Sequence, residues 1–220
     1  MIAGATAIVV AGERLLLLPQ RAAFWPNEQL LLIADLHLGK PHTFQREGLA
    51  VPQSTMTGDL NRLTYLVMET GAKRLLILGD FVHHRHGLTH TVRTQVETWI
   101  ASLRPLEIMV VVGNHDRPSL PFIASLPVTT VGECWEAGPF RFVHDNHYPT
   151  GAEPRFTWSG HLHPVLKIES HLRRHVPAFV FTEKQAVLPA FSLFTGGLPV
   201  KAREYCSIFA TADDQVIRLK

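Results

Sequence analysis

The sequence predicts an α/β fold in which a parallel sheet with crossover helices is followed by a second sheet packed on it. Apolar residues make up 46% of the 220 residues, which is enough to build a sizeable core. Strand-length apolar runs alternate with helical patterns up to residue 112, and after about residue 125 the helical pattern stops. We expect a single domain over residues 1–220, because no repeat, low-complexity tract or linker interrupts the chain.

The first half of the chain carries the parallel sheet. Continuous apolar runs at 30–34, 75–78 and 108–112 are typical of strands that are buried on both faces. Apolar residues recur at helical spacing in 55–70 and 90–103, so a helix is expected between each successive pair of strands. This alternating order predicts parallel pairing through right-handed crossovers.

Short strands separated by turn residues predict the second sheet. Strand-like runs in the later part of the chain lie at 140–143, 156–159, 179–182, 190–195 and 205–210. The last three indicate a mixed or antiparallel sheet packed on the first. The N-terminal stretch 8–18 is broken at Gly12, and we expect it to form a hairpin on that second sheet.

Side chains that bind metals collect where the strands end. In an open α/β sheet, ligands bind beyond the carboxyl ends of the strands. Carboxylate, imidazole and amide groups follow five successive strands, at Asp35, His37, Asp80, Asn114, His115, His144, His161 and His163. Taken singly, each has a structural interpretation such as a helix cap, a turn or a buried histidine, but together they indicate one site. These donors suit Mn, Fe, Zn or Mg, and no thiolate favours a softer metal.

The donor set is suited to a pair of divalent metals. Two metals about 3.5–4 Å apart clamp a phosphorus centre for in-line displacement, and such a pair needs a bridging ligand. Asp80 is placed for that role, and a bridging water or hydroxide would be the nucleophile because metal binding lowers its pKa. Asn114 offers a neutral oxygen to one metal. His115 is expected to bond a phosphate oxygen or protonate the leaving group, with Asp116 orienting its imidazole.

Five motifs resemble those of the calcineurin-like metallophosphoesterase superfamily: DLH at 35–37, GD at 79–80, GNHD at 113–116, a lone histidine at 144 and GHLH at 160–163. The resemblance spans roughly residues 30–165 and implies a double-layered β-sandwich flanked by helices, with a dinuclear metal centre. It implies that one metal binds Asp35, His37, Asp80 and His163, and that the other binds Asp80, Asn114, His144 and His161. It also implies that His115 is the acid or phosphate contact, with Asp116 behind it.

Within that superfamily the chain is similar to the bacterial ligase-associated metallophosphoesterases. The similar features are the short length, a strand-rich lead of about thirty residues, ADLHLGK at 34–40, REGLAVP at 46–52 and GDFVHH at 79–84. The resemblance implies a manganese-dependent phosphodiesterase and DNA endonuclease of DNA repair, with a DNA ligase and a helicase as partners. We expect single-stranded rather than duplex DNA as the substrate.

Basic and aromatic residues near these motifs are candidates for substrate contact. The basic candidates, each of which could instead lie in a solvated loop, are Lys40, His83, His84, Arg85, His86 and Arg117. The segment KIESHLRRH at 167–175 could follow a nucleic-acid backbone or form a solvated charged face. Phe44 and Trp158 could stack on bases or belong to the core.

Charge and cysteine content constrain the function less than the motifs do. The 21 Lys and Arg residues against 19 Asp and Glu make too small an excess to indicate nucleic acid by itself. Cys134 and Cys206 form no CxxC motif, and a reduced intracellular protein is the simpler interpretation. The N-terminal run lacks a basic region, and no apolar stretch approaches the ~20 residues of a spanning helix. We therefore expect a cytoplasmic protein that does not enter a membrane.

Two other functions stay open at this point. A small-molecule phosphoesterase acting on cyclic nucleotides, nucleotides or phosphoproteins would use the same metal centre, because the metals contact the phosphorus centre and not its substituents. A non-catalytic scaffold on the same fold, as in one retromer subunit, is disfavoured by the complete ligand set. Clustered buried Asp and His residues without a metal would cost stability.

Overall fold

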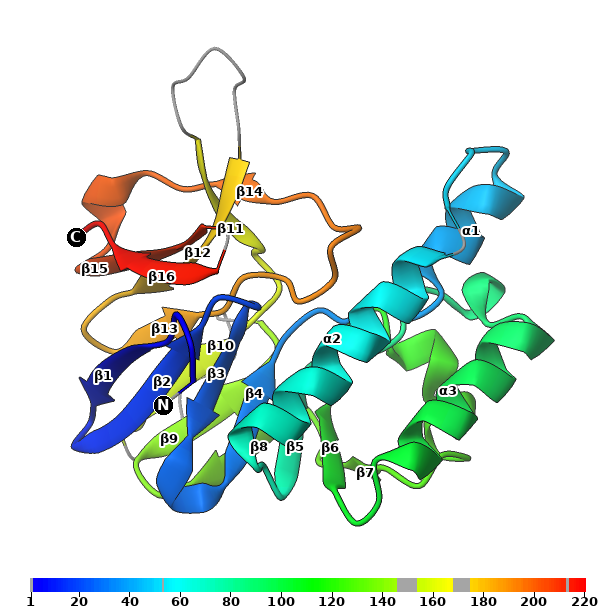
Figure 1. Ribbon diagram of the computed structural model, residues 1–220, viewed down its shortest axis with the longest axis horizontal. Coiled ribbons are helices and arrows are strands. Elements are labelled where there is room, and N and C mark those ends of the chain that lie inside the picture. The colour runs from blue at the N-terminus through cyan, green and yellow to red at the C-terminus, as the bar shows by residue number, and fades with distance from the viewer. Residues whose placement is uncertain (1, 53, 146–153, 168–174, 213) are drawn as a thin grey trace.

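The computed structural model describes residues 2–52, 54–145, 154–167, 175–212 and 214–220. Two sheets form the layers of the molecule, and helices cover the outer face of the first sheet (Figure 1). This architecture confirms the predicted α/β class and the double-layered sandwich flanked by helices. No helix in the described part of the chain has the length and apolar character needed to cross a bilayer.

The first sheet has seven strands in chain order. They are β1 (Thr6–Val10), β2 (Glu13–Leu18), β3 (Ala22–Trp25), β4 (Leu30–Ile33), β5 (Arg74–Leu78), β6 (Glu107–Val111) and β7 (Thr129–Thr130). The strands β4 to β7 pair in parallel, as the alternating pattern predicts, and β1 to β4 pair antiparallel. Because Ile33, Ile77 and Val110 lie side by side, the residues that follow β4, β5 and β6 meet at one edge of the sheet.

The second sheet is mixed. Its strands run in the order β14 (Leu198–Pro199), β11 (Pro164–Lys167), β12 (His175–Phe181), β13 (Gln185–Val187), β10 (Phe156–Ser159), β9 (Phe140–Val143) and β8 (Cys134–Ala137), with β15 (Ser207–Ala212) on β12 and β16 (Gln215–Arg218) on β15. The parallel pairing of β9 with β10 brings the residues after both strands to the same edge.

Helices connect the parallel strands. They are α1 (Lys40–Arg46), α2 (Ser54–Thr70), α3 (His90–Ser102) and α4 (Leu120–Ile123), with short 3-10 turns η1 (Pro26–Glu28), η2 (Arg85–Gly87), η3 (Arg117–Ser119) and η4 (Ala202–Glu204). The start of α3 is capped by the hydroxyl of Thr89, which accepts a hydrogen bond from the Val92 N–H at 3.3 Å. The two long helices lie where the apolar periodicity predicts them.

The first sheet separates two apolar cores because alternate residues of a strand face opposite sides. Leu31 and Ile77 pack against α2 and α3, while Leu32 and Leu76 face the second sheet. The aromatic side chains of β9, β10 and β12 fill the space between the sheets, and Trp158 among them is fully buried. The proposal that Trp158 stacks on bases is therefore wrong.

Two sequence predictions about the second sheet are also wrong. The N-terminal hairpin forms, but β3 joins it to β4, so it belongs to the first sheet. The segment 190–195 is not a strand: the N–H of Phe191 donates to Ala34 O at 2.8 Å and that of Ser192 to Asp35 O at 3.3 Å. This segment is apolar because it covers the end of β4 and buries the Phe191 ring.

Candidate metal centre

Five of the expected ligands have left-handed backbone conformations. The angle φ is 56° at Asp35, 51° at His37, 50° at Asp80, 67° at His161 and 47° at His163. Such conformations are uncommon for residues other than glycine, cost about 1–3 kcal/mol each and cluster at functional sites. Hydrogen bonds between loops hold them, including the one from the His37 N–H to Asp80 O at 2.8 Å. The backbone is therefore strained at these five positions, and this conformation directs the side chains toward the site.

Two motif glycines allow the loops to touch the carboxylates. A Cβ on Gly113 would lie 2.3 Å from Asp80 Oδ1, and a Cβ on Gly160 would lie 2.7 Å from Asp35 Oδ2. Both distances are far below contact distance, so any larger side chain would displace a carboxylate. The glycines of GNHD and GHLH are thus needed for the packing of the site.

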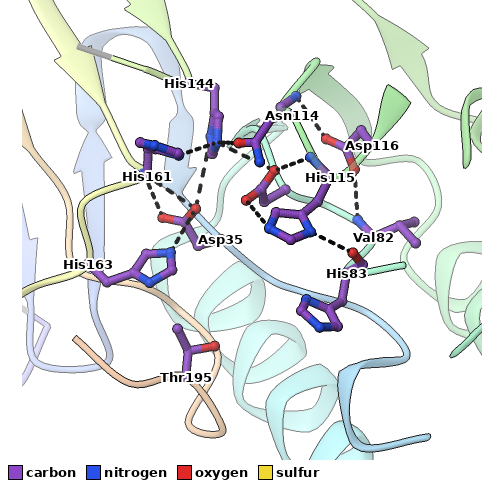
Figure 2. A network of polar contacts seen from close by, with 12 residues as sticks. Asp35, Val82, His83, Asn114, His115, Asp116, His144, His161, His163 and Thr195 are labelled. Carbon is purple, nitrogen blue, oxygen red and sulfur yellow. Dashed lines mark hydrogen bonds and ion pairs between the residues drawn. The ribbon is translucent and has the colours of Figure 1, made fainter. Parts of the chain in front are cut away.

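The structure brings the expected ligands together in two groups. Each group has its ligand atoms within 4.8 Å of one another, and the groups are Asp35, His37, His163 and Asp80, His144, His161. Asn114 joins the second group, with its Oδ1 2.9 Å from His144 Nε2. Figure 2 shows Asp35, Asn114, His144, His161 and His163 of these groups converging from several loops. The division follows the two ligand sets that the resemblance implies, except that Asp80, which is expected in both sets, lies in the second group, and its bridging role stays a prediction.

The imidazoles are prepared to bind a cation. Both ring nitrogens of His37 are buried and have no hydrogen-bond partner among the described residues, and the buried Nε2 of His163 lies 3.2 Å from Asp35 Oδ1. Burial, followed by the charge of Lys40, lowers the pKa of His37 to about 2, so its ring is neutral and its lone pair free. His144 Nδ1 lies 2.9 Å from the carbonyl oxygen of Leu78, which leaves Nε2 for the site. Metal-binding histidines are typically oriented in this way, so the residues fit a divalent ion.

The carboxylates favour positive charge at this position. Burial alone would raise the pKa of Asp80, but the hydrogen bond and charge of His144 lower it to about 2. Burial alone would lower the pKa of His144, but Asp80 and Asp35 raise it to about 9. The distance from His144 Nε2 to Asp80 Oδ1 is 3.4 Å. Carboxylate and imidazole ligands of this kind suit Mn, Fe, Zn or Mg, and a metal bound at Nε2 of His144 would replace the proton of that ring.

His115 lies next to the second group with one nitrogen facing it. Its Nδ1 is 2.8 Å from the carbonyl oxygen of His83, and its Nε2 is 4.0 Å from Asp80 Oδ2. The backbone N–H of His115 donates to Asp80 Oδ1 at 3.0 Å, so the loop is tied to the carboxylate of Asp80. The side chain is 39% exposed and can therefore reach a substrate.

Asp116 does not make the contact that the sequence predicts. Its carboxylate is buried and accepts hydrogen bonds from the N–H groups of Phe81, Val82 and Gly113 at 3.2, 2.8 and 3.0 Å (Figure 2). The imidazole of His115 is oriented by a backbone carbonyl instead. Burial raises the pKa of Asp116 to about 6, against the effect of the three N–H donors. Asp116 thus ties the GNHD loop to the loop after β5.

The rings of Phe44, His83 and His115 form a stack. The His83 ring lies 5.0 Å from the His115 ring at an interplanar angle of 22°, and the Phe44 ring lies 6.0 Å from the His83 ring at 14°. Burial, followed by the charge of Lys40, lowers the pKa of His83 to about 4, so this ring is neutral. The sequence suggests His83 and Phe44 as substrate contacts, which stays a prediction, and the structure adds that both rings stack beside the imidazole of His115.

Lys40 and Thr195 form one part of the site, and the sequence predicts only Lys40. Lys40 Nζ donates a hydrogen bond to Thr195 Oγ1 at 3.0 Å. The negative charges of Asp35 and Asp80 act to raise the pKa of Lys40. Burial nevertheless lowers the pKa of Lys40. No sequence signal points to Thr195, because the apolar run 190–195 predicts a strand.

The remaining candidates lie around the site. His84 Nδ1 caps η2 by accepting the His86 N–H at 3.2 Å, and Arg85 is exposed in the same turn. Arg117 pairs with Glu133 at 2.7 Å. Most of the basic segment 167–175 lies outside the described residues.

A family comparison decides the class to which this site belongs. The family model for calcineurin-like phosphoesterases matches residues 29–177, which is more than half of the chain. The chain belongs to the calcineurin-like phosphoesterase family. The two ligand groups therefore lie in a calcineurin-like phosphoesterase domain, the family that the five motifs resemble.

Two solved structures are similar to the chain, and the first of them supports the family assignment. The chain is 33% identical to the Pseudomonas putida nuclease MPE with a TM-score of 0.85, covering 98% of this chain and 100% of that chain. It is 16% identical to Yfce, a phosphoesterase from E. coli, with a TM-score of 0.44, covering 86% of this chain and 96% of that chain. No curated protein matches the chain.

Proposed function

We propose that the chain is a phosphodiesterase with two divalent metals, Mn²⁺ foremost, that cuts single-stranded DNA. The observation that carries the proposal is the pair of ligand groups, with Nε2 of His115 4.0 Å from the Asp80 carboxylate of the second group. The similarity to a nuclease over 98% of this chain supports nucleic acid as the substrate. A role in DNA repair beside a DNA ligase and a helicase follows from the narrower family resemblance, and a cytoplasmic location follows from the N-terminal sequence and the cysteine content.

Specific residues have separate tasks in this proposal. Asp35, His37, Asp80 and His163 hold one ion, and Asp80, Asn114, His144 and His161 hold the other. The ions supply charge neutralisation at the phosphate and activation of water.

His115 binds a phosphate oxygen or delivers a proton to the leaving oxygen from Nε2, the nitrogen that faces the site. The carbonyl of His83 and the ring stack keep that nitrogen in position. Lys40 adds positive charge on the side of Asp35 and Asp80.

A small-molecule phosphoesterase is the competing function, because the same centre would hydrolyse a cyclic nucleotide or a nucleotide. A non-catalytic scaffold is disfavoured, since unpartnered buried imidazoles next to buried carboxylates cost stability unless a cation is bound.

The decisive experiment is a metal and substrate matrix. Metal-free protein is reloaded with Mn²⁺, Zn²⁺, Mg²⁺, Fe²⁺ or Ca²⁺ and assayed on single-stranded DNA, duplex DNA, RNA and bis-p-nitrophenyl phosphate. We expect Mn²⁺-dependent cutting of single-stranded DNA that disappears in Asp80→Ala. The control is Glu69→Ala, which removes an exposed carboxylate of α2. Hydrolysis of only the aryl diester or a nucleotide would contradict the DNA assignment, whereas no hydrolysis with any metal would favour the scaffold.

A further inference from the structure

Outside the metal centre, a pocket lies beside the loops that carry His115 and His83. It has a volume of about 380 Å³ and is formed by η2, the first turns of α3, η3 and α4. Its lining includes Arg85, Arg93, Ser119, Phe122 and Ser125. Arg85 follows His83 by two residues, and Ser119 follows His115 by four. The pocket is therefore lined by residues that follow His83 and His115 closely in the chain.

The chemistry of this pocket is that of an anion site. Arg93 Nε donates to Leu88 O at 3.0 Å, and its guanidinium lies 4.8 Å from the centre of the Phe122 ring, so the group has a fixed plane. Ser119 is 2% exposed, and its Oγ has no hydrogen-bond partner among the described residues. The lining contains no carboxylate. Fixed guanidinium planes and free hydroxyls are the groups that bind phosphate oxygens.

A pocket at the metal centre itself differs in charge. It has a volume of about 250 Å³ and is lined by Asn114, His144 and His161 together with Arg117, Glu133 and Asp145. The guanidinium of Arg117 is paired with Glu133 at 2.7 Å, so its charge is balanced. Neither Arg85 nor Arg93 has a carboxylate within ion-pair distance among the described residues. A polyanion leaving the centre is thus drawn toward Arg85 and Arg93.

We propose that the pocket of Arg85, Arg93 and Ser119 binds a backbone phosphate of a single-stranded nucleic acid next to the phosphate that is hydrolysed. The pocket then sets the direction in which the strand leaves the metal centre. This inference rests on the proposed function and deepens it, because a mononucleotide or an aryl diester has no second phosphodiester to place there.

The test is binding of a fluorescein-labelled single-stranded oligonucleotide to the metal-free protein, measured by anisotropy over a range of salt concentrations. One phosphate contact contributes about 0.7 to the slope of log K against log salt for a single strand. We expect Arg93→Gln to reduce that slope by about 0.7 and to weaken binding about fivefold at ~0.1 M salt. Arg85→Gln should have the same effect, and Arg93→Lys should keep the slope.

The matched control is Arg104→Gln, which removes the same charge just beyond the other end of α3. Arg104 is exposed and precedes β6, so it lies at the sheet end opposite to the site. It should bind like wild type. Thermal unfolding followed by circular dichroism shows whether each variant is folded, and the Arg85→Gln variant tests the pocket without touching the Arg93 contact to Leu88.

The outcomes separate this inference from the proposed function. If the wild type binds and cuts the oligonucleotide but both glutamine variants keep its affinity and salt slope, the pocket assignment is overturned and the nuclease stands. If inorganic phosphate competes with the oligonucleotide only in proteins that retain Arg93, at concentrations similar to those of the oligonucleotide phosphate, the pocket is a free-phosphate site. If the wild type hydrolyses bis-p-nitrophenyl phosphate but neither binds nor cuts the oligonucleotide, both proposals fail.

Discussion

At the scale of single residues, the role of His115 depends on which ring nitrogen is free. Its Nδ1 lies 2.8 Å from a carbonyl oxygen, so Nε2 is the nitrogen that can meet a phosphate or a leaving oxygen. His115→Ala should keep both metals and lower kcat on DNA by roughly 10²–10⁴-fold. The loss should be smaller for bis-p-nitrophenyl phosphate, whose leaving group needs no proton.

Metal content and kcat on the two substrates check this prediction. The control His90→Ala removes an exposed imidazole at the start of α3 and should change neither. Loss of metal in His115→Ala would assign this side chain to the metal ligands instead.

The ring stack makes a prediction for Phe44. Phe44→Leu removes one aromatic contact of His83, worth about 0.5–1.5 kcal/mol, and lets the His115 ring move. We expect kcat to fall by up to about tenfold with little change in KM, and Phe44→Tyr to retain activity. A raised KM at constant kcat would instead mean that Phe44 contacts the substrate, as the sequence alone suggests.

Residue identities could be predicted from the motifs, but several contacts could not. The order of DLH, GD, GNHD and GHLH indicates which side chains meet, because parallel strands end at one edge. Nothing in GNHD tells that Asp116 points away from His115 toward three N–H groups, since that depends on the path of the neighbouring loop.

At the scale of elements, α2 anchors the segment 190–195 beside the site. The carboxylate of Asp59 accepts the Leu193 N–H at 3.2 Å and pairs with Arg62 at 3.3 Å. Arg62 also donates to Phe191 O and lies 4.1 Å from the centre of the Phe191 ring. The loop that carries Thr195 is thus held from the helix side.

Removing this anchor should destabilise the fold. Asp59→Ala leaves the half-buried Arg62 without its carboxylate, and we expect the free energy of unfolding in urea to fall by about 2–4 kcal/mol. Glu69→Ala on the same helix is exposed and should change it by less than about 0.5 kcal/mol. Equal stability of the two variants would mean that α2 does not hold the segment.

The sequence predicts element type better than element partners. The hairpin of β1 and β2 is visible in its turn, but its sheet is decided by β3, a four-residue strand that continues the antiparallel order to β4. The apolar run 190–195 has a strand's composition because Phe191 is buried, although its N–H groups bond to the loop after β4. A continuous apolar run is expected both for a buried loop and for a buried strand, so the sequence of 190–195 does not distinguish them.

At the scale of the whole molecule, bound metals should stabilise the native state. The two ligand groups join loops after β4, β5, β9 and β10, so the ions would link both sheets. Mn²⁺ at about 100 times its Kd adds ~2.7 kcal/mol per site, which raises Tm by roughly 5–10 °C for a chain of this size. Thermal unfolding with and without Mn²⁺ measures this shift, and Asp80→Ala should lose most of it. An equal shift in that variant would place the ions elsewhere.

The most direct test of the central claim is the number of metal ions bound per chain, measured together with cleavage of single-stranded DNA. Wild-type protein reloaded with Mn²⁺ should bind two ions and cut the DNA. Asp80→Ala should bind fewer than two and cut none, because the shared carboxylate is gone. A chain that binds a single ion, or an Asp80→Ala variant that still binds two ions and cleaves, would contradict a dinuclear centre organised around Asp80.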